Sequence, residues 1–232
     1  MTFGSLFAGI GGMDLGLECA GMTCKWQVEI DPFCQKVLAK HWPEVKRYGD
    51  IRTVNGSELE AVDLIAGGFP CQDVSHAGQR AGIDGARSGL WSQMLRIIGQ
   101  LRPSYCLVEN VTGLLDRGMG RVLGGLAEIG FDAEWTVLSA CTFGAPHPRE
   151  RVFILAYPAG GRQRQLRRLQ CTEESAPKRN VYWSKSEPGC ERMADGIPGR
   201  VDRLTALGNA VVPQIAEWIG RRIMAIESEC AA

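Results

Sequence analysis

Three groups of residues with chemically useful side chains follow apolar runs in this sequence. Pro70-Cys71 comes after the run that ends in Gly67-Gly68-Phe69, and Glu109-Asn110 comes after the run Tyr105–Val108. Near the start, Leu6–Gly12 contains three glycines, which allow a backbone to approach a ligand closely. A thiol, a carboxyl group and a glycine loop in one place would suit covalent catalysis beside a bound ligand.

Each of these features also has a simpler interpretation. The Cys71 thiol could be a small buried apolar group, and the glycine loop could be a tight turn that holds no ligand. Glu109 could be a surface acid or a helix cap, and Asp50 an ordinary turn aspartate. The catalytic interpretation is favoured because Cys71 and Glu109 both fall at predicted strand ends, where the sites of α/β proteins form. Glu29, at the end of another predicted strand, is similarly placed to bind ribose hydroxyls.

Strand and helix patterns alternate through the first 158 residues, which predicts an α/β fold with a mostly parallel sheet covered on both faces. Asp31-Pro32 fits a helix start, and Gly130 fits a helix stop. We expect a catalytic and cofactor-binding domain over 1–158, an insertion over 159–200, and a C-terminal helix within 201–232 that returns to the first domain. The predicted strands are 1–7, 24–30, 62–66, 105–108, 133–139 and 151–156, and the predicted helices run to about residue 20, from residue 31, and over 88–101, 119–129 and 211–226.

Composition limits the class of protein. The 232 residues have a hydrophobic content of 45% and a charged content of 22%, as is usual for a globular protein in water. The nine cysteines include no C-x-x-C pair, which favours a reducing compartment and argues against a structural zinc site. No apolar run approaches the roughly 20 residues that span a bilayer, and the N-terminus has no secretion signal.

The formal net charge is zero, but the charge is unevenly distributed. The segment Arg162–Lys185 contains seven Lys or Arg residues against Glu173 and Glu174. Such a run can be a solvated surface loop, or it can bind nucleic acid through phosphates and base edges.

Eight short motifs, in this order along the chain, resemble those of the DNA cytosine-5 methyltransferases over nearly the whole length. The Pro-Cys-Gln, Glu-Asn-Val and Gly-Asn-Ala-Val elements together are highly specific. The motifs are Leu6–Gly12, Glu29–Asp31, Gly49–Ile51, Gly67–Gln72, Gly85–Leu90, Glu109–Val111, Arg149–Arg151 and Gly208–Val211.

The resemblance implies a Rossmann-like fold that transfers a methyl group from S-adenosyl-L-methionine to C5 of cytosine in DNA, leaves S-adenosyl-L-homocysteine and uses no metal. Cys71 would add to C6, Glu109 would bond the N3 edge, and Arg151, with Arg149 as a second candidate, would bond O2. The base would have to leave the duplex to reach the thiol. The cofactor residues implied are Phe7, Gly9, Gly11, Gly12, Glu29, Ile30, Asp50, Ile51, Leu90, Asn209 and Val211.

The resemblance also implies double-stranded DNA as the partner, and we expect a monomer acting in the cytoplasm of a bacterium, encoded by the bacterium or a phage, in restriction-modification or a related role. Because the insertion has only about 40 residues, we expect it to read a short target of about two to four base pairs. Two alternatives stay open: an RNA (tRNA) cytosine-5 methyltransferase, although Cys141-Thr142-Phe143 does not match the Cys-Phe-Thr element of that branch, and a catalytically weak DNA-binding relative. The DNA contacts implied are Ser75, Gln79, Arg87, Arg162, Arg164, Arg167 and Arg168.

Overall fold

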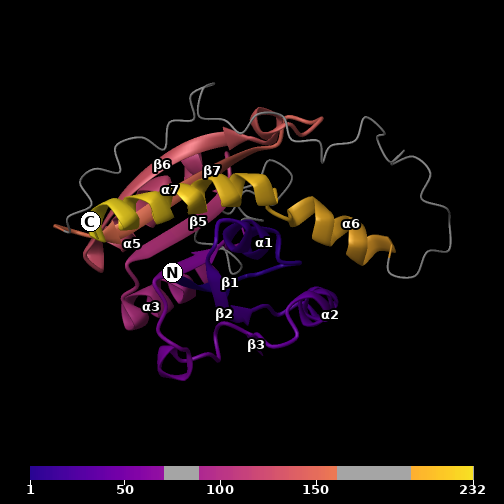
Figure 1. Ribbon diagram of the computed structural model, residues 1–232, viewed down its shortest axis with the longest axis horizontal. Helices are drawn as coiled ribbons and strands as arrows, with labels where there is room; N and C mark the ends of the chain where they lie inside the picture. Colours follow the sequence, from indigo (N-terminus) through magenta and orange to yellow (C-terminus); the bar gives the residue numbers. More distant parts are fainter. Residues whose placement is uncertain (71–88, 161–199, 232) are drawn as a thin grey trace.

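The computed structural model describes residues 1–70, 89–160 and 200–231, which form three layers with one sheet in the middle (Figure 1). The expected α/β fold with a mostly parallel sheet is confirmed. Cys71 and the predicted DNA contacts Ser75, Gln79, Arg87, Arg162, Arg164, Arg167 and Arg168 lie outside the described residues. Within those residues, no helix has the length and apolar character that crossing a membrane would require.

The sheet has seven strands in the order β3-β2-β1-β4-β5-β7-β6. The first five in this order run parallel, β7 runs antiparallel to β5, and β6 runs antiparallel to β7. The carboxyl ends of the parallel strands therefore share one edge with the amino end of β7. The strands are β1 (Thr2–Leu6), β2 (Thr23–Val28), β3 (Lys46–Tyr48), β4 (Leu64–Gly67), β5 (Tyr105–Val111), β6 (Phe131–Ser139) and β7 (Glu150–Pro158).

Helices pack on both faces of the sheet. Helices α1 and α7 cover one face, while α3 and α5 cover the other. In Figure 1, α7 crosses in front of the sheet, and α6 leads into α7. The helices are α1 (Gly12–Cys19), α2 (Pro32–His41), α3 (Leu90–Leu101), α4 (Leu114–Arg117), α5 (Met119–Glu128), α6 (Arg200–Asn209) and α7 (Pro213–Ala231), with short 3₁₀ turns at Gly56–Glu58 and Ala140–Phe143.

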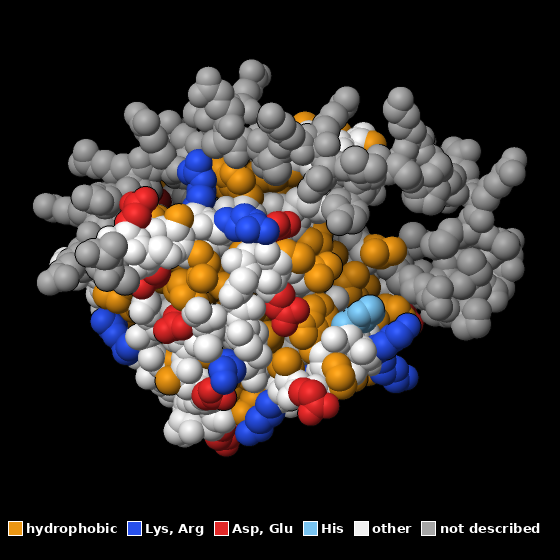
Figure 2. Space-filling view, viewed as in Figure 1, with side chains coloured by type: hydrophobic (Ala, Val, Ile, Leu, Met, Phe, Trp, Pro, Cys, Tyr) orange, Lys and Arg blue, Asp and Glu red, His pale blue; other side chains and the backbone are white. Residues whose placement is uncertain are grey.

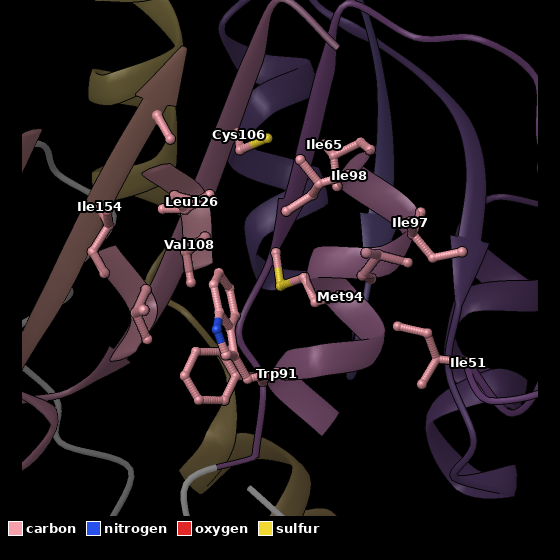
Figure 3. Packing of buried hydrophobic residues seen from close by; sticks show 14 of the residues in the cluster. Ile51, Ile65, Trp91, Met94, Ile97, Ile98, Cys106, Val108, Leu126 and Ile154 are labelled. Atoms are coloured by element: carbon pink, nitrogen blue, oxygen red, sulfur yellow. The ribbon is translucent and has the colours of Figure 1, made fainter. Parts of the chain in front are cut away.

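Two apolar clusters separate the layers, because successive side chains of a strand point to opposite faces. Ile65 and Val108 join α3 and α5 in one cluster, whereas Leu64 and Leu107 join α1 and α7 in the other. Figure 3 shows the first cluster, in which Trp91, Met94, Ile97 and Ile98 of α3 face the sheet. On the outer surface, Figure 2 shows basic and acidic side chains interspersed with apolar ones over the visible face of the described residues.

Local signals in the sequence are confirmed where one turn of chain decides the structure. Asp31 caps α2 by accepting hydrogen bonds from the backbone N–H groups of Phe33 and Cys34, and Pro32 is the first helical residue. Gly130 follows α5 with a φ of 76°, a conformation that suits glycine. The last helix, α7, packs on α1; it begins at Pro213, and a separate helix, α6, precedes it.

Candidate active site

The strand ends open onto a cavity of about 750 Å³. Glu109, Arg149 and Arg151 line it, together with Gly68 and Pro70, the residues that lead to Cys71. The structure thus brings the predicted catalytic residues that it describes, and all but one of the predicted cofactor residues, to one cavity. Ten of the eleven predicted cofactor residues line it: Phe7, Gly9, Gly12, Glu29, Ile30, Asp50, Ile51, Leu90, Asn209 and Val211.

The glycine loop after β1 holds Glu29 in a fixed position. The Gly9 N–H group donates to Glu29 Oε2 over 2.7 Å, and the Asp31 N–H group donates to Glu29 Oε1 over 2.8 Å. Gly9 has a φ of 56°, and a Cβ at this position would meet no atom within 4 Å. The half-buried carboxylate of Glu29 therefore keeps an acceptor lone pair on each oxygen available at the cavity wall.

Gly11 has a different role from its neighbours. It is the left-handed residue that precedes α1, with a φ of 84°, and a Cβ there would lie 2.4 Å from the Trp42 ring. Gly11 does not line the cavity. Glycine is required at this position because the backbone is left-handed and because the Trp42 ring leaves no room for a Cβ.

Asp50 and Ile51 follow β3 in a turn that is held from two sides. Both Asp50 carboxylate oxygens accept hydrogen bonds from Arg52, and these bonds lower the pKa of Asp50. On the other side, Arg96 of α3 donates to the carbonyls of Ile51 and Val54, each over 2.9 Å. The turn therefore presents the buried Ile51 side chain and the Asp50 carboxylate to the cavity.

Glu109 is the buried acid of the site. Burial raises its pKa to about 7, although the guanidinium groups of Arg151 and Arg149 act in the opposite direction. Arg151 Nε lies 3.1 Å from Glu109 Oε1. A Cβ on Gly68 would lie 2.6 Å from Glu109 Oε2, so a larger residue at position 68 would displace the carboxyl group from its present position. Near neutral pH, part of the Glu109 population is a neutral acid that can donate a proton.

Strand β5 continues through Glu109 to Val111, beyond the predicted end at Val108. The extension exists because β7 pairs with β5 in the antiparallel sense, Glu109 opposite Phe153 and Val111 opposite Arg151. Glu109 still lies just past the end of β4, because Gly67 pairs with Val108.

The chain that leads to Cys71 is fixed by Asn110. Its Nδ2 donates to the Phe69 carbonyl over 3.1 Å, and its Oδ1 accepts from the Val111 N–H group. Asn110 is buried, and the Phe69 ring packs against Trp91 with ring centroids 5.3 Å apart. These contacts set the direction of the backbone before Pro70.

Arg149 does not bond Glu109. Its two terminal nitrogens donate to backbone carbonyls 59 and 61 positions away: Nη1 to Gly208 over 2.6 Å and Nη2 to Ala210 over 3.0 Å. Burial and the nearby Arg151 lower the pKa of Arg149. The two arginines of one motif thus reach different partners.

Helix α6 supplies cavity residues that the sequence interpretation missed, namely Asp202, Thr205 and Ala206. With Asn209 they occur at positions i, i+3, i+4 and i+7, which share one face of a helix. Counting back from Asn209 at this helical spacing would have predicted these three positions as cavity residues.

A buried carboxyl group lies behind the cavity wall. Asp14 of α1 accepts hydrogen bonds from Ser5 Oγ over 2.6 Å and from Gln27 Nε2 over 2.7 Å. Ser5 lines the cavity. Burial raises the pKa of Asp14 from 3.8 to about 6, while both hydrogen bonds oppose the shift. Gln27 Oε1 is buried and has no hydrogen-bond partner among the described residues.

The sheet and the cavity define an α/β protein of Rossmann-like type, with a ligand site at the carboxyl ends of its strands. Residues 1–187 match the family model for C-5 cytosine-specific DNA methylases. The chain belongs to this family. Within the described part of the chain, no three His, Cys, Asp or Glu side chains gather as metal ligands would.

Curated relatives and solved structures agree with the family. The chain is 41% identical over 160 residues to the type II methyltransferase M2.BsuMI of Bacillus subtilis, a match that covers 66% of this chain and 41% of the relative. It is 35% identical over 177 residues to M.AquIA of a Picosynechococcus strain, covering 67% and 71%. A crystal structure described as a DNA modification methyltransferase encoded within an Escherichia coli prophage aligns with a TM-score of 0.57 and 26% identity, covering 68% and 47%. The chain spans less than half the length of the first curated relatives that it matches.

Proposed function

We propose that the protein transfers a methyl group from S-adenosyl-L-methionine to C5 of cytosine in double-stranded DNA, through a covalent bond between Cys71 and C6. One observation carries the proposal. Glu109, a buried acid with a pKa near neutrality, is paired with Arg151 on the same cavity as Glu29 and Asp50. A base site and a nucleoside site would therefore adjoin one another.

Besides the thiol, the reaction requires a donor at N3 of the cytosine and a group that holds the ring in place. Cytosine C5 is a weak nucleophile until the Cys71 sulfur adds to C6 and electrons move into the ring toward N3. Glu109 would donate a hydrogen bond or proton to N3 at that moment, and Arg151 would bond O2 and hold the ring in place. After C5 takes the methyl group, loss of the C5 proton expels the Cys71 sulfur.

The residues at the cavity fit S-adenosyl-L-methionine, whose sulfonium supplies an activated methyl group. Glu29 offers two fixed carboxylate oxygens, as two ribose hydroxyls require. Asp50 and Ile51 would bind the edge and face of the adenine. On the opposite side, Asn209 and Val211 would complete the wall.

The DNA would enter with its target base flipped into the cavity, because a stacked base cannot reach a buried acid. We propose the basic insertion, 159–200, as the reader of the flanking duplex, with Arg162, Arg164, Arg167 and Arg168 on phosphates or base edges. The loop that follows Cys71, with Ser75, Gln79 and Arg87, would close over the DNA. Both segments lie outside the described residues.

Trapping with 5-fluorocytosine tests the proposal. Fluorine takes the place of the C5 proton whose loss expels the sulfur, and it cannot leave as F⁺, so the Cys71–C6 bond persists. Wild-type protein with S-adenosyl-L-methionine should form a denaturation-resistant adduct on duplex DNA, and Cys71→Ala should form none. The exposed Cys141 provides the matched control, and Cys141→Ala should react like wild type. If wild type forms no adduct on DNA, DNA is not the substrate, and if Cys71→Ala forms an adduct, the nucleophile is a different residue. An adduct on tRNA alone would select the RNA alternative.

The role of Glu109 has a separate test. Glu109→Gln preserves shape but cannot give up a proton, and we expect the methylation rate to fall about 10²- to 10⁴-fold. In wild type, adduct formation should slow as the pH rises above 7, where Glu109 ionises. A wild-type profile that is flat between pH 6 and 9 would rule out Glu109 as the proton donor.

A further inference from the structure

Arg149, the first arginine of the Arg149–Arg151 motif, caps a helix. Gly208 is in the last turn of α6, and its carbonyl, like the others in that turn, has no partner inside the helix. Arg149 Nη1 donates to this carbonyl, and Nη2 donates to the carbonyl of Ala210, just past the helix end. A guanidinium at a helix C-terminus also interacts favourably with the helix dipole.

The same segment is held from its other side by α1. A Cβ on Gly12 would lie 2.3 Å from the Val211 carbonyl oxygen, and one on Gly16 would lie 2.2 Å from that of Pro213. The backbone between α6 and α7 therefore lies directly against a glycine face of α1, and Arg149, the residue before β7, is hydrogen-bonded to it. Figure 1 shows this junction where α6 leads into α7.

The position of the α6–α7 junction determines where the cavity-lining residues of α6 lie. Asp202, Thr205 and Ala206 line the cavity from the helix, and Asn209 lines it from between the two carbonyls that Arg149 holds. Arg151, two residues further on, instead reaches Glu109. The motif therefore connects the proposed base site to the proposed cofactor wall.

We propose that Arg149 is a positioning residue for cofactor binding: it fixes α6 and Asn209 as one wall of the cavity, and it makes no contact with the target base. The identity of the ligand rests on the function proposed above. Affinity for the cofactor depends on Arg149, because without it the wall must be ordered when the ligand binds.

Calorimetry with S-adenosyl-L-homocysteine, in the absence of DNA, tests the proposal. Arg149→Gln removes both charged hydrogen bonds and should weaken binding about 10- to 100-fold. Arg149→Lys keeps the charge and one donor direction and should lie in between. Arg151→Lys is the matched control, because it changes the neighbouring arginine, and it should bind the ligand as wild type does.

Kinetics separate positioning from a direct role at the base. When S-adenosyl-L-methionine is titrated, Arg149→Gln should raise KM for the cofactor. At saturation, kcat should stay within about 3-fold of wild type, since bound ligand restores the displaced wall. Arg151→Lys should show the reverse. If Arg149→Gln binds the ligand normally and loses kcat at saturation, Arg149 acts at the base and the proposal is overturned.

Hydrogen exchange provides a readout that needs neither ligand nor activity. The backbone amides of 203–210 should exchange faster in Arg149→Lys than in wild type, while those of β5 should be unchanged. Unchanged exchange in α6 would refute the proposal even if Arg149→Gln failed to fold. If wild type bound no S-adenosyl-L-homocysteine, the proposed function would fail, and the exchange result would still decide whether Arg149 holds α6.

Discussion

Replacing Asp14 by asparagine should make the protein more stable at alkaline pH. The pKa of Asp14 is raised from 3.8 to about 6, so the unfolded chain loses this proton at a lower pH than the folded protein does. Folding stability is therefore highest below pH 3.8 and falls as the pH rises to about 6. At about 1.4 kcal/mol per pKa unit, the ionised group costs about 3 kcal/mol at pH 8 and about 1.6 kcal/mol at pH 5.

Asparagine fits the hydrogen bonds that the site already contains. The Asn Oδ1 atom can accept from Ser5, and its Nδ2 group can donate to Gln27 Oε1 if the Gln27 amide turns over. That oxygen is the buried atom that has no partner among the described residues. We therefore expect little loss of packing, because the new side chain has almost the same shape.

Urea unfolding at pH 5 and pH 8 measures the effect. The stability of Asp14→Asn relative to wild type should improve by about 1.4 kcal/mol between the two pH values, or about 3 to 6 °C in Tm for a chain of this size. The exposed Asp116 is the control, and Asp116→Asn should follow the wild-type profile because water screens its charge. If wild type and Asp14→Asn gave parallel profiles, the carboxyl group would not be titrating in the way its burial requires.

Three further predictions concern the cofactor, the packing of α1 and the DNA. Glu29→Ala should weaken S-adenosyl-L-homocysteine binding about 10- to 150-fold by calorimetry, since a charged acceptor of two hydroxyls is lost; unchanged affinity would place the nucleoside elsewhere. Gly12→Ala should lower the free energy of unfolding by about 1 to 3 kcal/mol, because its Cβ would lie 2.3 Å from the Val211 carbonyl oxygen, and a wild-type urea midpoint would contradict that packing. Replacing Arg167 and Arg168 with alanine should weaken DNA binding and flatten its salt dependence without changing cofactor affinity, whereas an unchanged salt slope would exclude phosphate contacts.

Sequence patterns predicted those parts of the fold that nearby residues decide. The cap at Asp31, the stop at Gly130 and the strand end near Glu29 follow from residue types within one turn or one strand. The length of β5 could not be predicted in this way, because its last residues are ordered by antiparallel pairing with β7.

The site was predictable as a set of residues but not as a set of contacts. The motifs contained many of the residues that line the cavity, although not those of α6. Spacing alone could not say that Arg149 reaches carbonyls about 60 positions away, since that contact depends on how α6 packs. Gly11 shows the same limit. Its place in a glycine loop predicted a ligand contact, and the structure instead shows Trp42 filling the space beside it.

The packing of α7 on α1 has a consequence for synthesis of the chain. Arg221 of α7 donates to the Cys19 carbonyl, 202 positions earlier, and Ile215 and Ile219 cover the apolar residues Met13 and Leu17. A ribosome that adds about 5 to 20 residues per second needs about 10 to 40 s between these helices. Throughout this time the nascent chain exposes one face of its sheet and lacks the Asn209–Val211 wall of the cavity. Exposed apolar surface of this kind makes a nascent chain prone to aggregation until α7 has packed.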